Sequence, residues 1–169
     1  ATLLAMGRPD LAREAYQASN AVRENASAWV GLGVVGMVYR EWDHAAECFT
    51  RAAIVDPYDA SAYCGTGQVL AIKRDVVAAQ RAMNQAIGLD PTNALPYAML
   101  ALVHELRADA ESARIAYGLS SQYAGPSSGL ALAVAARSEE IRRNPPTPVP
   151  TATPRPTMSP TPIPTSAIY

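Results

Sequence analysis

Two histidines and two cysteines are the side chains of this 169-residue sequence best suited to nucleophilic or metal chemistry. His44 and His104 lie far apart, and neither has a Cys or Ser partner at a plausible catalytic spacing. Cys48 and Cys64 belong to no CxxC motif and no Cys/His ligand set, so both are expected to be small buried side chains. A Gly-rich phosphate loop, a His-Glu-x-x-His motif and a nucleophile elbow are also missing. The sequence therefore predicts no catalytic residue, no metal site and no cofactor.

Hydroxyl side chains gather near the C-terminus, where covalent glycosylation is the chemistry to consider. Residues 144–166 hold nine of the fourteen prolines, interleaved with Thr and Ser. This composition is typical of an O-glycosylated stalk or surface spacer, and the alternative is a bare linker to a further domain. Asn25, followed by Ala and Ser, is an N-glycosylation sequon. The candidate acceptors are Thr147, Thr151, Thr153, Thr157, Ser159, Thr161, Thr165, Ser166 and Asn25.

The balance of charges argues against two classes of partner. Lys and Arg number 14 against 15 Asp and Glu, for a net charge of −1. Without a basic surplus, we expect no binding to nucleic acid or to an anionic membrane. Glu139 and Glu140 stand among Arg residues and are expected to form solvated ion pairs. No run of about 18 uncharged apolar residues occurs, so no membrane span is expected.

An internal repeat shows which elements must position these side chains. Residues 26–59 and 60–93 align without a gap. The alignment pairs Trp29 with Tyr63, Gly33 with Gly67, Ala45 with Ala79, Phe49 with Met83, Ala52 with Ala86, and Asp56-Pro57 with Asp90-Pro91. Small residues let two helices approach closely, large ones fill the space between them, and Pro ends the second helix. The pattern predicts helix hairpins that bury their apolar faces only by stacking on one another.

This spacing resembles the tetratricopeptide repeat. The first copy carries Trp29-x2-Leu32-Gly33, then Ala45-x3-Phe49-x2-Ala52 and a closing Pro57. It departs from the family pattern at Gly36, where Tyr is usual, and the second copy has Thr66 in the Leu slot. The resemblance implies an all-α fold, a right-handed superhelical solenoid of helix hairpins.

The predicted organisation extends this pattern to both ends of the chain. Its parts are a partial repeat at 1–25, repeats at 26–59 and 60–93, a degenerate repeat at 94–125, a capping helix at 126–143 and a Pro/Thr-rich tail at 144–169. Only the last turns of a first helix are expected before residue 7. Proline fixes φ and removes a backbone donor, so the tail is expected to be extended and polyproline-II-like. At ~3.1 Å per residue, it would reach about 70 Å.

In the tetratricopeptide family the first helices of successive hairpins line a concave groove. The residues that the resemblance places there are Val30, Val34, Met37, Gln68, Ile72, Leu95, Met99 and Leu102. Chaperone-binding members carry Lys, Arg and Asn in these slots to clamp a carboxylate. Here Cys64, Gln68 and the two valines replace them, so no dicarboxylate clamp is expected. The stripe is expected either to bind a protein segment or, in part, to belong to the core.

These observations favour a non-enzymatic protein-interaction or structural module over an enzyme. The first hypothesis is a self-assembling, homo-oligomeric fibre subunit on a prokaryotic cell surface or outside the cell. Its tail residues Ile163, Ile168 and Tyr169 would dock on a partner. The second is a peptide-binding adaptor of the cell envelope with the tail as a spacer. The third is the repeat region of a larger protein. The expected partner is protein, bound head-to-tail or as a segment in the groove, with glycans on the acceptors above.

Overall fold

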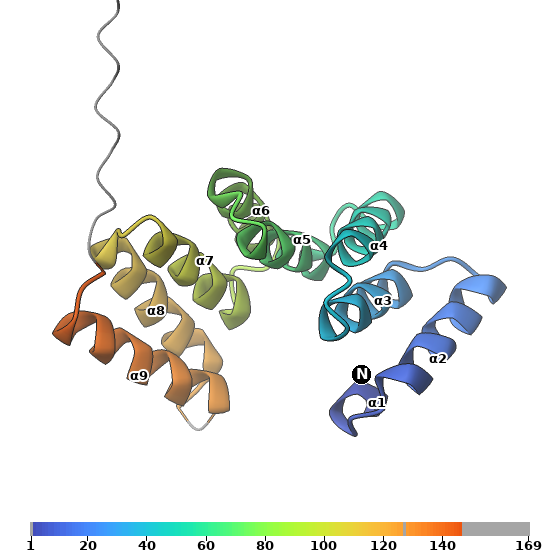
Figure 1. Ribbon diagram of the computed structural model, residues 1–169, viewed down its shortest axis with the longest axis horizontal. Coiled ribbons are helices and arrows are strands. Elements are labelled where there is room, and N and C mark those ends of the chain that lie inside the picture. Colours follow the sequence, from blue (N-terminus) through green and yellow to red (C-terminus); the bar gives the residue numbers. More distant parts are fainter. Residues whose placement is uncertain (1, 127, 147–169) are drawn as a thin grey trace, which may run out of the picture.

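The computed structural model describes residues 2–126 and 128–146, which form α-helices and contain no strand (Figure 1). The helices are α1 (Thr2–Ala5), α2 (Pro9–Val22), α3 (Ala26–Val38), α4 (Trp42–Val55), α5 (Ala60–Ile72), α6 (Val76–Leu89), α7 (Ala94–Leu106), α8 (Ala110–Ala124) and α9 (Gly129–Arg143). The all-α solenoid expected from the sequence is confirmed. The tail from residue 147 onward lies outside the described residues, so its expected polyproline-II conformation stays a prediction.

The repeat is visible in the helix boundaries themselves. The first helices of three hairpins begin at residues 26, 60 and 94, and the second helices begin at 42, 76 and 110. Each pair packs as an antiparallel hairpin, and each hairpin packs on the next one. Helices α1 and α2 precede this array, and α9 packs against α8. Figure 1 shows the resulting superhelical arc, with α2 near one end and α9 at the other.

The helix ends follow from short polar side chains placed at equivalent positions. Asn25, Asp59 and Asn93 precede the first helices, and each side chain accepts a hydrogen bond from a backbone N–H of the first turn. Such N-caps satisfy amides that have no partner within the helix. The turn inside each hairpin passes through a left-handed residue, with φ of 60° at Arg40, 65° at Arg74 and 57° at Ala108. The same turn geometry therefore recurs in all three hairpins.

One aromatic ring joins the first two full hairpins. Phe49 of α4 is 1% exposed. A Cβ added at Gly33 of α3 would lie 2.7 Å from its Cε1, and a Cβ added at Gly65 of α5 would overlap the ring. The ring is thus held between two helices that approach closely because both glycines lack a side chain. Gly36, the departure from the family pattern, serves a similar close approach, since a Cβ there would lie 3.2 Å from that of Ala45.

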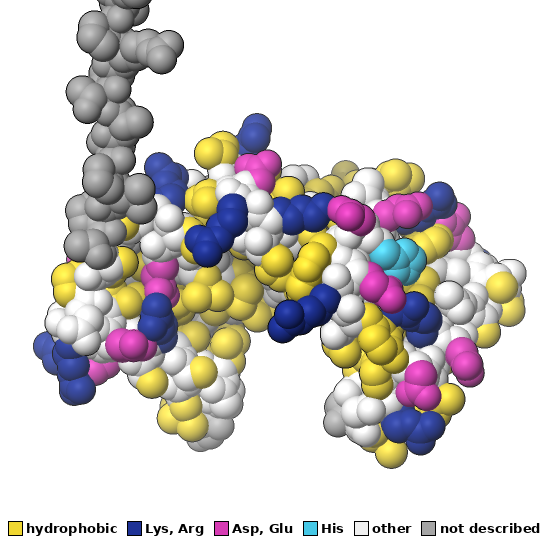
Figure 2. All heavy atoms as spheres, in the orientation of Figure 1, with side chains coloured by type: hydrophobic (Ala, Val, Ile, Leu, Met, Phe, Trp, Pro, Cys, Tyr) yellow, Lys and Arg dark blue, Asp and Glu magenta, His cyan; other side chains and the backbone are white. Residues whose placement is uncertain are grey.

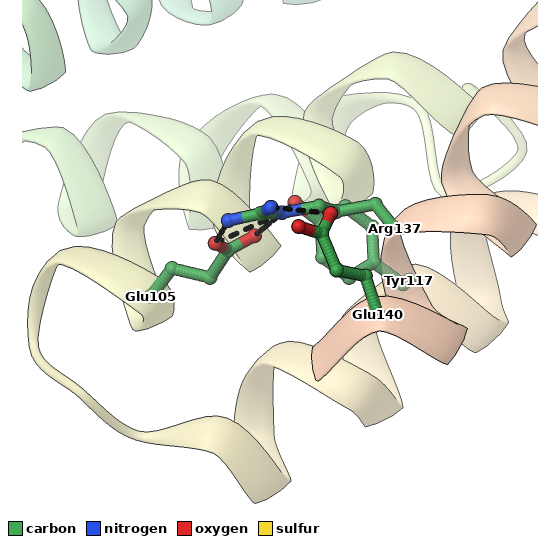
Figure 3. A network of polar contacts seen from close by, with 4 residues as sticks. All are labelled: Glu105, Tyr117, Arg137 and Glu140. Carbon is green, nitrogen blue, oxygen red and sulfur yellow. Dashed lines mark hydrogen bonds and ion pairs between the residues drawn. The ribbon is translucent and has the colours of Figure 1, made fainter. Parts of the chain in front are cut away.

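The last hairpin replaces this apolar contact with a polar network that fixes α9 (Figure 3). Tyr117 occupies the slot of Phe49 and is 3% exposed, so its hydroxyl needs a buried acceptor. It donates to the carboxylate of Glu105, which also receives the guanidinium of Arg137 from α9. The remaining guanidinium nitrogen of Arg137, Nη1, donates to Glu140 at 2.7 Å. Burial, together with this hydrogen bond to Glu105, raises the pKa of Tyr117 above its ordinary value.

Candidate functional site

The residues expected in the groove come from three helices that stand side by side. Helix α3 contacts α5, and α5 contacts α7. Because the first helices repeat at a fixed interval, the same face of each helix turns toward the inside of the arc. Figure 2 shows this view of the molecule hollowed between its two ends, with hydrophobic side chains along the hollow.

A mainly apolar pocket lies at the C-terminal ends of these three helices. Its volume is about 700 Å³. The expected groove residues in its lining are Met37, Gln68, Ile72, Met99 and Leu102, and the others are Ala71, Arg74, Glu105 and Leu106. The structure therefore brings together five of the eight expected residues, contributed by all three first helices.

The remaining expected residues line the other part of the same face. Val30, Val34, Leu95 and Gln68 surround a pocket of about 130 Å³ between α3, α5 and α7. Gln68 lines both pockets and so marks where they meet. The two valines also border a wider opening of about 870 Å³, whose rim carries three carboxylates, from Asp56, Asp59 and Asp90. One end of the groove is therefore acidic and its middle is apolar.

The degree of exposure distinguishes these side chains from the core. Ile72 is 45% exposed and Leu102 is 40% exposed, while Val34 and Leu95 are each 37% exposed. Val30, Met37, Gln68 and Met99 are half-buried, so none of the eight belongs to the fully buried core. Cys64, which shares the helix face, is 4% exposed and does belong to it. Because this apolar strip is partly exposed, a partner that covered it would remove apolar surface from water.

Two charged residues of the main pocket were missed by sequence reasoning. Arg74 is the left-handed turn residue after α5, and Glu105 lies in the last turn of α7. Glu105 occupies the slot that Met37 and Ala71 hold in the two preceding repeats. The same alignment, continued into the degenerate repeat, places Glu105 in this slot. Within the linings of these three pockets of the described chain, Arg74 is the only cation. The four residues in the slots of a carboxylate clamp, Val30, Val34, Cys64 and Gln68, line the pocket of about 130 Å³ together.

The expectation that neither histidine has a cysteine partner was wrong for His44. Its Nε2 lies 3.6 Å from Sγ of Cys48, one turn further along α4. The i, i+4 spacing within a helix would have revealed this contact. Burial, followed by the charge of Glu47, raises the pKa of the Cys48 thiol to about 11. A thiol that is protonated at neutral pH is a poor nucleophile.

The two cysteines lead to a prediction about alkaline pH. Burial raises the pKa of Cys64 from 9.0 to about 11, as it does for Cys48. A raised folded-state pKa leaves stability unchanged below pH 9 and lowers it as pH rises from 9 toward 11, because the unfolded chain releases the proton first. By pH 10 the loss should be about 1 kcal/mol per thiol. Urea unfolding at pH 8 and pH 10 would measure it.

The matched variant for this experiment carries Ala at both cysteines. It should lose less stability than the unsubstituted chain between pH 8 and pH 10. The pKa of Tyr117 is also raised, so the part of the stability loss that Tyr117 causes should be the same in both proteins. Equal losses in the two proteins would contradict the assignment to the thiols.

The candidate glycosylation sites fall in two groups. Asn25 is the N-cap of α3, where its Oδ1 accepts from the backbone of Ala28 at 2.8 Å. Its Nδ2 donates to Ser19 and to the carbonyl of Arg23, each at 3.2 Å, and a glycan on this nitrogen would have to displace at least one of these bonds. The hydroxyl acceptors from Thr147 to Ser166, and the docking residues Ile163, Ile168 and Tyr169, lie outside the described residues.

Two further searches of the described residues concern metals and membranes. No group of three or more His, Cys, Asp or Glu side chains in this part of the chain is arranged to hold a metal ion. None of the helices described here combines the length and the apolar character needed to cross a bilayer.

Comparison with known proteins agrees with this architecture. A tetratricopeptide repeat family model matches residues 40–94. No curated protein sequence matches the chain at a significant level.

Among solved structures, the first TPR domain of Spaghetti (RPAP3), bound to an HSP90 peptide, superimposes with a TM-score of 0.64 and 16% identity over 71% of this chain and 92% of that one. The TPR2B domain of yeast Sti1, in complex with pHsp70, superimposes with a TM-score of 0.65 and 18% identity over 70% of this chain and 96% of that one. A chain of the APC/C hetero-tetramer Cut9–Hcn1 superimposes with a TM-score of 0.68 and 22% identity over 80% of this chain and 27% of that one. The family match shows a tetratricopeptide repeat at residues 40–94, and the solved structures share the helical solenoid fold of the chain.

Proposed function

We propose that this chain is a non-enzymatic protein-interaction module that binds an apolar segment of another protein in its groove. The observation that carries the proposal is the pocket formed by Met37, Ile72, Met99 and Leu102, which three successive first helices contribute together. These side chains are held by a repeat scaffold, yet remain half-buried or exposed. An incoming aliphatic side chain would bury apolar area that the protein cannot cover by itself.

The charges around the groove indicate which residues the bound segment would contain. The middle of the groove is apolar, and the wider opening at one end of it carries Asp56, Asp59 and Asp90 on its rim. Electrostatic complementarity favours a segment with large aliphatic residues followed or preceded by a basic residue that reaches this rim. The solved TPR domains bound to an HSP90 peptide and to pHsp70 support peptide binding as a use of this fold. Their ligands are not expected to be those of this chain, because Val30, Val34 and Cys64 supply no cation for a carboxylate.

Selection from a library of displayed random peptides would test this function. Peptides enriched on the full chain should contain paired aliphatic residues and should bind the double variant Ile72→Glu/Leu102→Glu at least about tenfold more weakly, a loss of ~1.4 kcal/mol. The control is Val77→Glu, because Val77 is 63% exposed and lines none of the groove pockets. Peptides that bind both variants equally well would show that this groove is not the binding site.

A second candidate is the self-assembling fibre subunit at a cell surface or outside the cell. Apolar side chains are exposed at both ends of the solenoid, with Met6 70%, Val22 90% and Leu132 65% exposed. Solenoid ends of this kind favour head-to-tail stacking, which propagates as a filament if it does not close. Size-exclusion chromatography and negative-stain microscopy of native material would show discrete monomers if this candidate is wrong. The intact mass of the same material would reveal glycans on the acceptor residues.

A further inference from the structure

The outer face of α8 carries an apolar stripe that the groove does not use. Ile115, Leu119 and Tyr123 follow one another at intervals of one helical turn and are 53%, 36% and 40% exposed. The first two line a crevice of about 230 Å³ together with Tyr97 and Leu100 of α7. Tyr97 stacks on Tyr123, with ring centroids 5.2 Å apart. The crevice therefore has aliphatic walls and one aromatic side chain, Tyr97, which is backed by Tyr123.

The repeat itself does not require this stripe. The slots of Ile115 and Leu119 are occupied by Arg81 and Gln85 in the middle hairpin, and by Glu47 and Arg51 in the first. In the first hairpin, Arg51 lies 5.3 Å from the ring centroid of Trp29 and 3.6 Å from the carboxylate of Glu47. At these two positions the helix face is thus polar in two hairpins and apolar in the third, whereas the slot of Tyr123 is apolar in all three, with Leu89 and Val55 in the others. This difference favours a ligand that binds to the last hairpin alone.

The last hairpin and α9 directly precede the Pro/Thr-rich segment in the sequence. Ile141, near the end of α9, packs in one cluster with Ala113 and Ala110 from the first turn of α8. In Figure 1 the chain leaves α9 beside the turn between α7 and α8. Residues 147–169 follow in the sequence. At ~3.1 Å per residue in an extended form they span about 70 Å, whereas the stripe is only about 12 Å long at 1.5 Å per helical residue. The segment is long enough to turn back onto α8.

The chemistry of the two surfaces is complementary. Proline-rich segments dock in crevices lined by aromatic side chains, because their restricted backbone loses little entropy on binding. The segment contains Val149 and Ile163 among its prolines, and Arg155 is its one charged side chain. We propose that the segment 147–166 of this chain binds intramolecularly in the crevice between α7 and α8. The concave groove then stays open for a partner, so this proposal does not depend on the function assigned to the groove.

A spin label on the segment tests the proposal in the full-length chain. The label is placed at Thr161→Cys in a variant with Ala at Cys48 and Cys64, and the amide resonances are recorded at low protein concentration. Residues 115–123 and 97–104 should lose most of their signal intensity through proximity to the label. The loss should be absent in the matched variant Ile115→Glu/Leu119→Arg. These two replacements are the residues that the first hairpin carries in the same slots, and both positions are exposed.

Three outcomes would overturn the proposal. One is unchanged intensity along α8 in a chain shown by circular dichroism to be folded. Another is a loss at Ile72, Met99 and Leu102, which would place the segment in the concave groove. The third is a loss along α8 that appears when an isotope-labelled chain without the spin label is mixed with a spin-labelled chain without isotope, because the segment would then bind a second copy. Signal loss confined to α7 and α8 within single chains supports the proposal.

Discussion

Replacing Gly65 by Ala is expected to lower the free energy of unfolding by about 2 kcal/mol, although Ala is the better helix former. Gly65 faces the ring of Phe49 in the preceding hairpin, and a methyl group there would overlap the ring. The ring cannot move away, since Gly33 borders it on the other side and its own exposure is 1%. Two hairpins must therefore separate to admit one carbon atom. Urea unfolding followed by circular dichroism measures the loss.

Gly118→Ala is the matched control for this prediction. Gly118 is a solvent-exposed glycine inside α8, and nothing lies within 4 Å of a Cβ added there. Helix propensity alone should make this variant more stable by about 0.5–1 kcal/mol. The sign of the effect should thus differ between two identical substitutions. The cost of Gly65→Ala should also shrink in a Phe49→Leu background, and an unchanged cost would show that the ring is not what opposes the methyl group.

Replacing Arg137 by Met is expected to cost about 2 kcal/mol and to release α9 from the last hairpin. Glu105 has a side chain only 11% exposed and accepts hydrogen bonds from Arg137 and Tyr117. Without the guanidinium, its charge would remain in a largely desolvated site with a single neutral donor. The exposure of Arg137, at 44%, limits the cost below that of a fully buried pair. Urea unfolding gives the loss, and amide hydrogen exchange along α9 shows where it acts.

Arg142→Met provides the comparison within the same helix. Arg142 pairs with Glu139 at 2.7 Å, but the two side chains are 69% and 38% exposed. Such surface pairs contribute at most about 0.5 kcal/mol, so this variant should retain the stability and the slow exchange of α9. If both variants behaved alike, the network of Figure 3 would have no special part in holding the helix.

The periodic pattern and its small residues specified the fold. Gly33, Ala45 and Pro57 could be placed in their hairpin because each answers a local requirement, namely close approach of two helices or termination of one. The face that lines the groove followed in the same way, since a fixed repeat carries one helix face to equivalent positions. The structure places the eight expected groove residues as half-buried or exposed side chains that line two adjoining pockets.

Residues whose roles depend on contacts across the sequence were not found in this way. The His44–Cys48 contact was overlooked even though its spacing was readable. The joining of Glu105, Tyr117 and Arg137 had no such local signal, because their proximity depends on how α9 packs on the last hairpin.

The sequence by itself determined the helix hairpins, their period and the apolar character of the groove, because these properties depend on residue types at fixed short spacings. Only the tertiary structure decided which residues of equal hydrophobicity stay exposed. Ile115 and Leu119 have the composition of core residues, yet they lie on an outer face that no described helix covers. Burial is a property of the neighbours that surround a side chain, and a pattern read along one helix does not contain them.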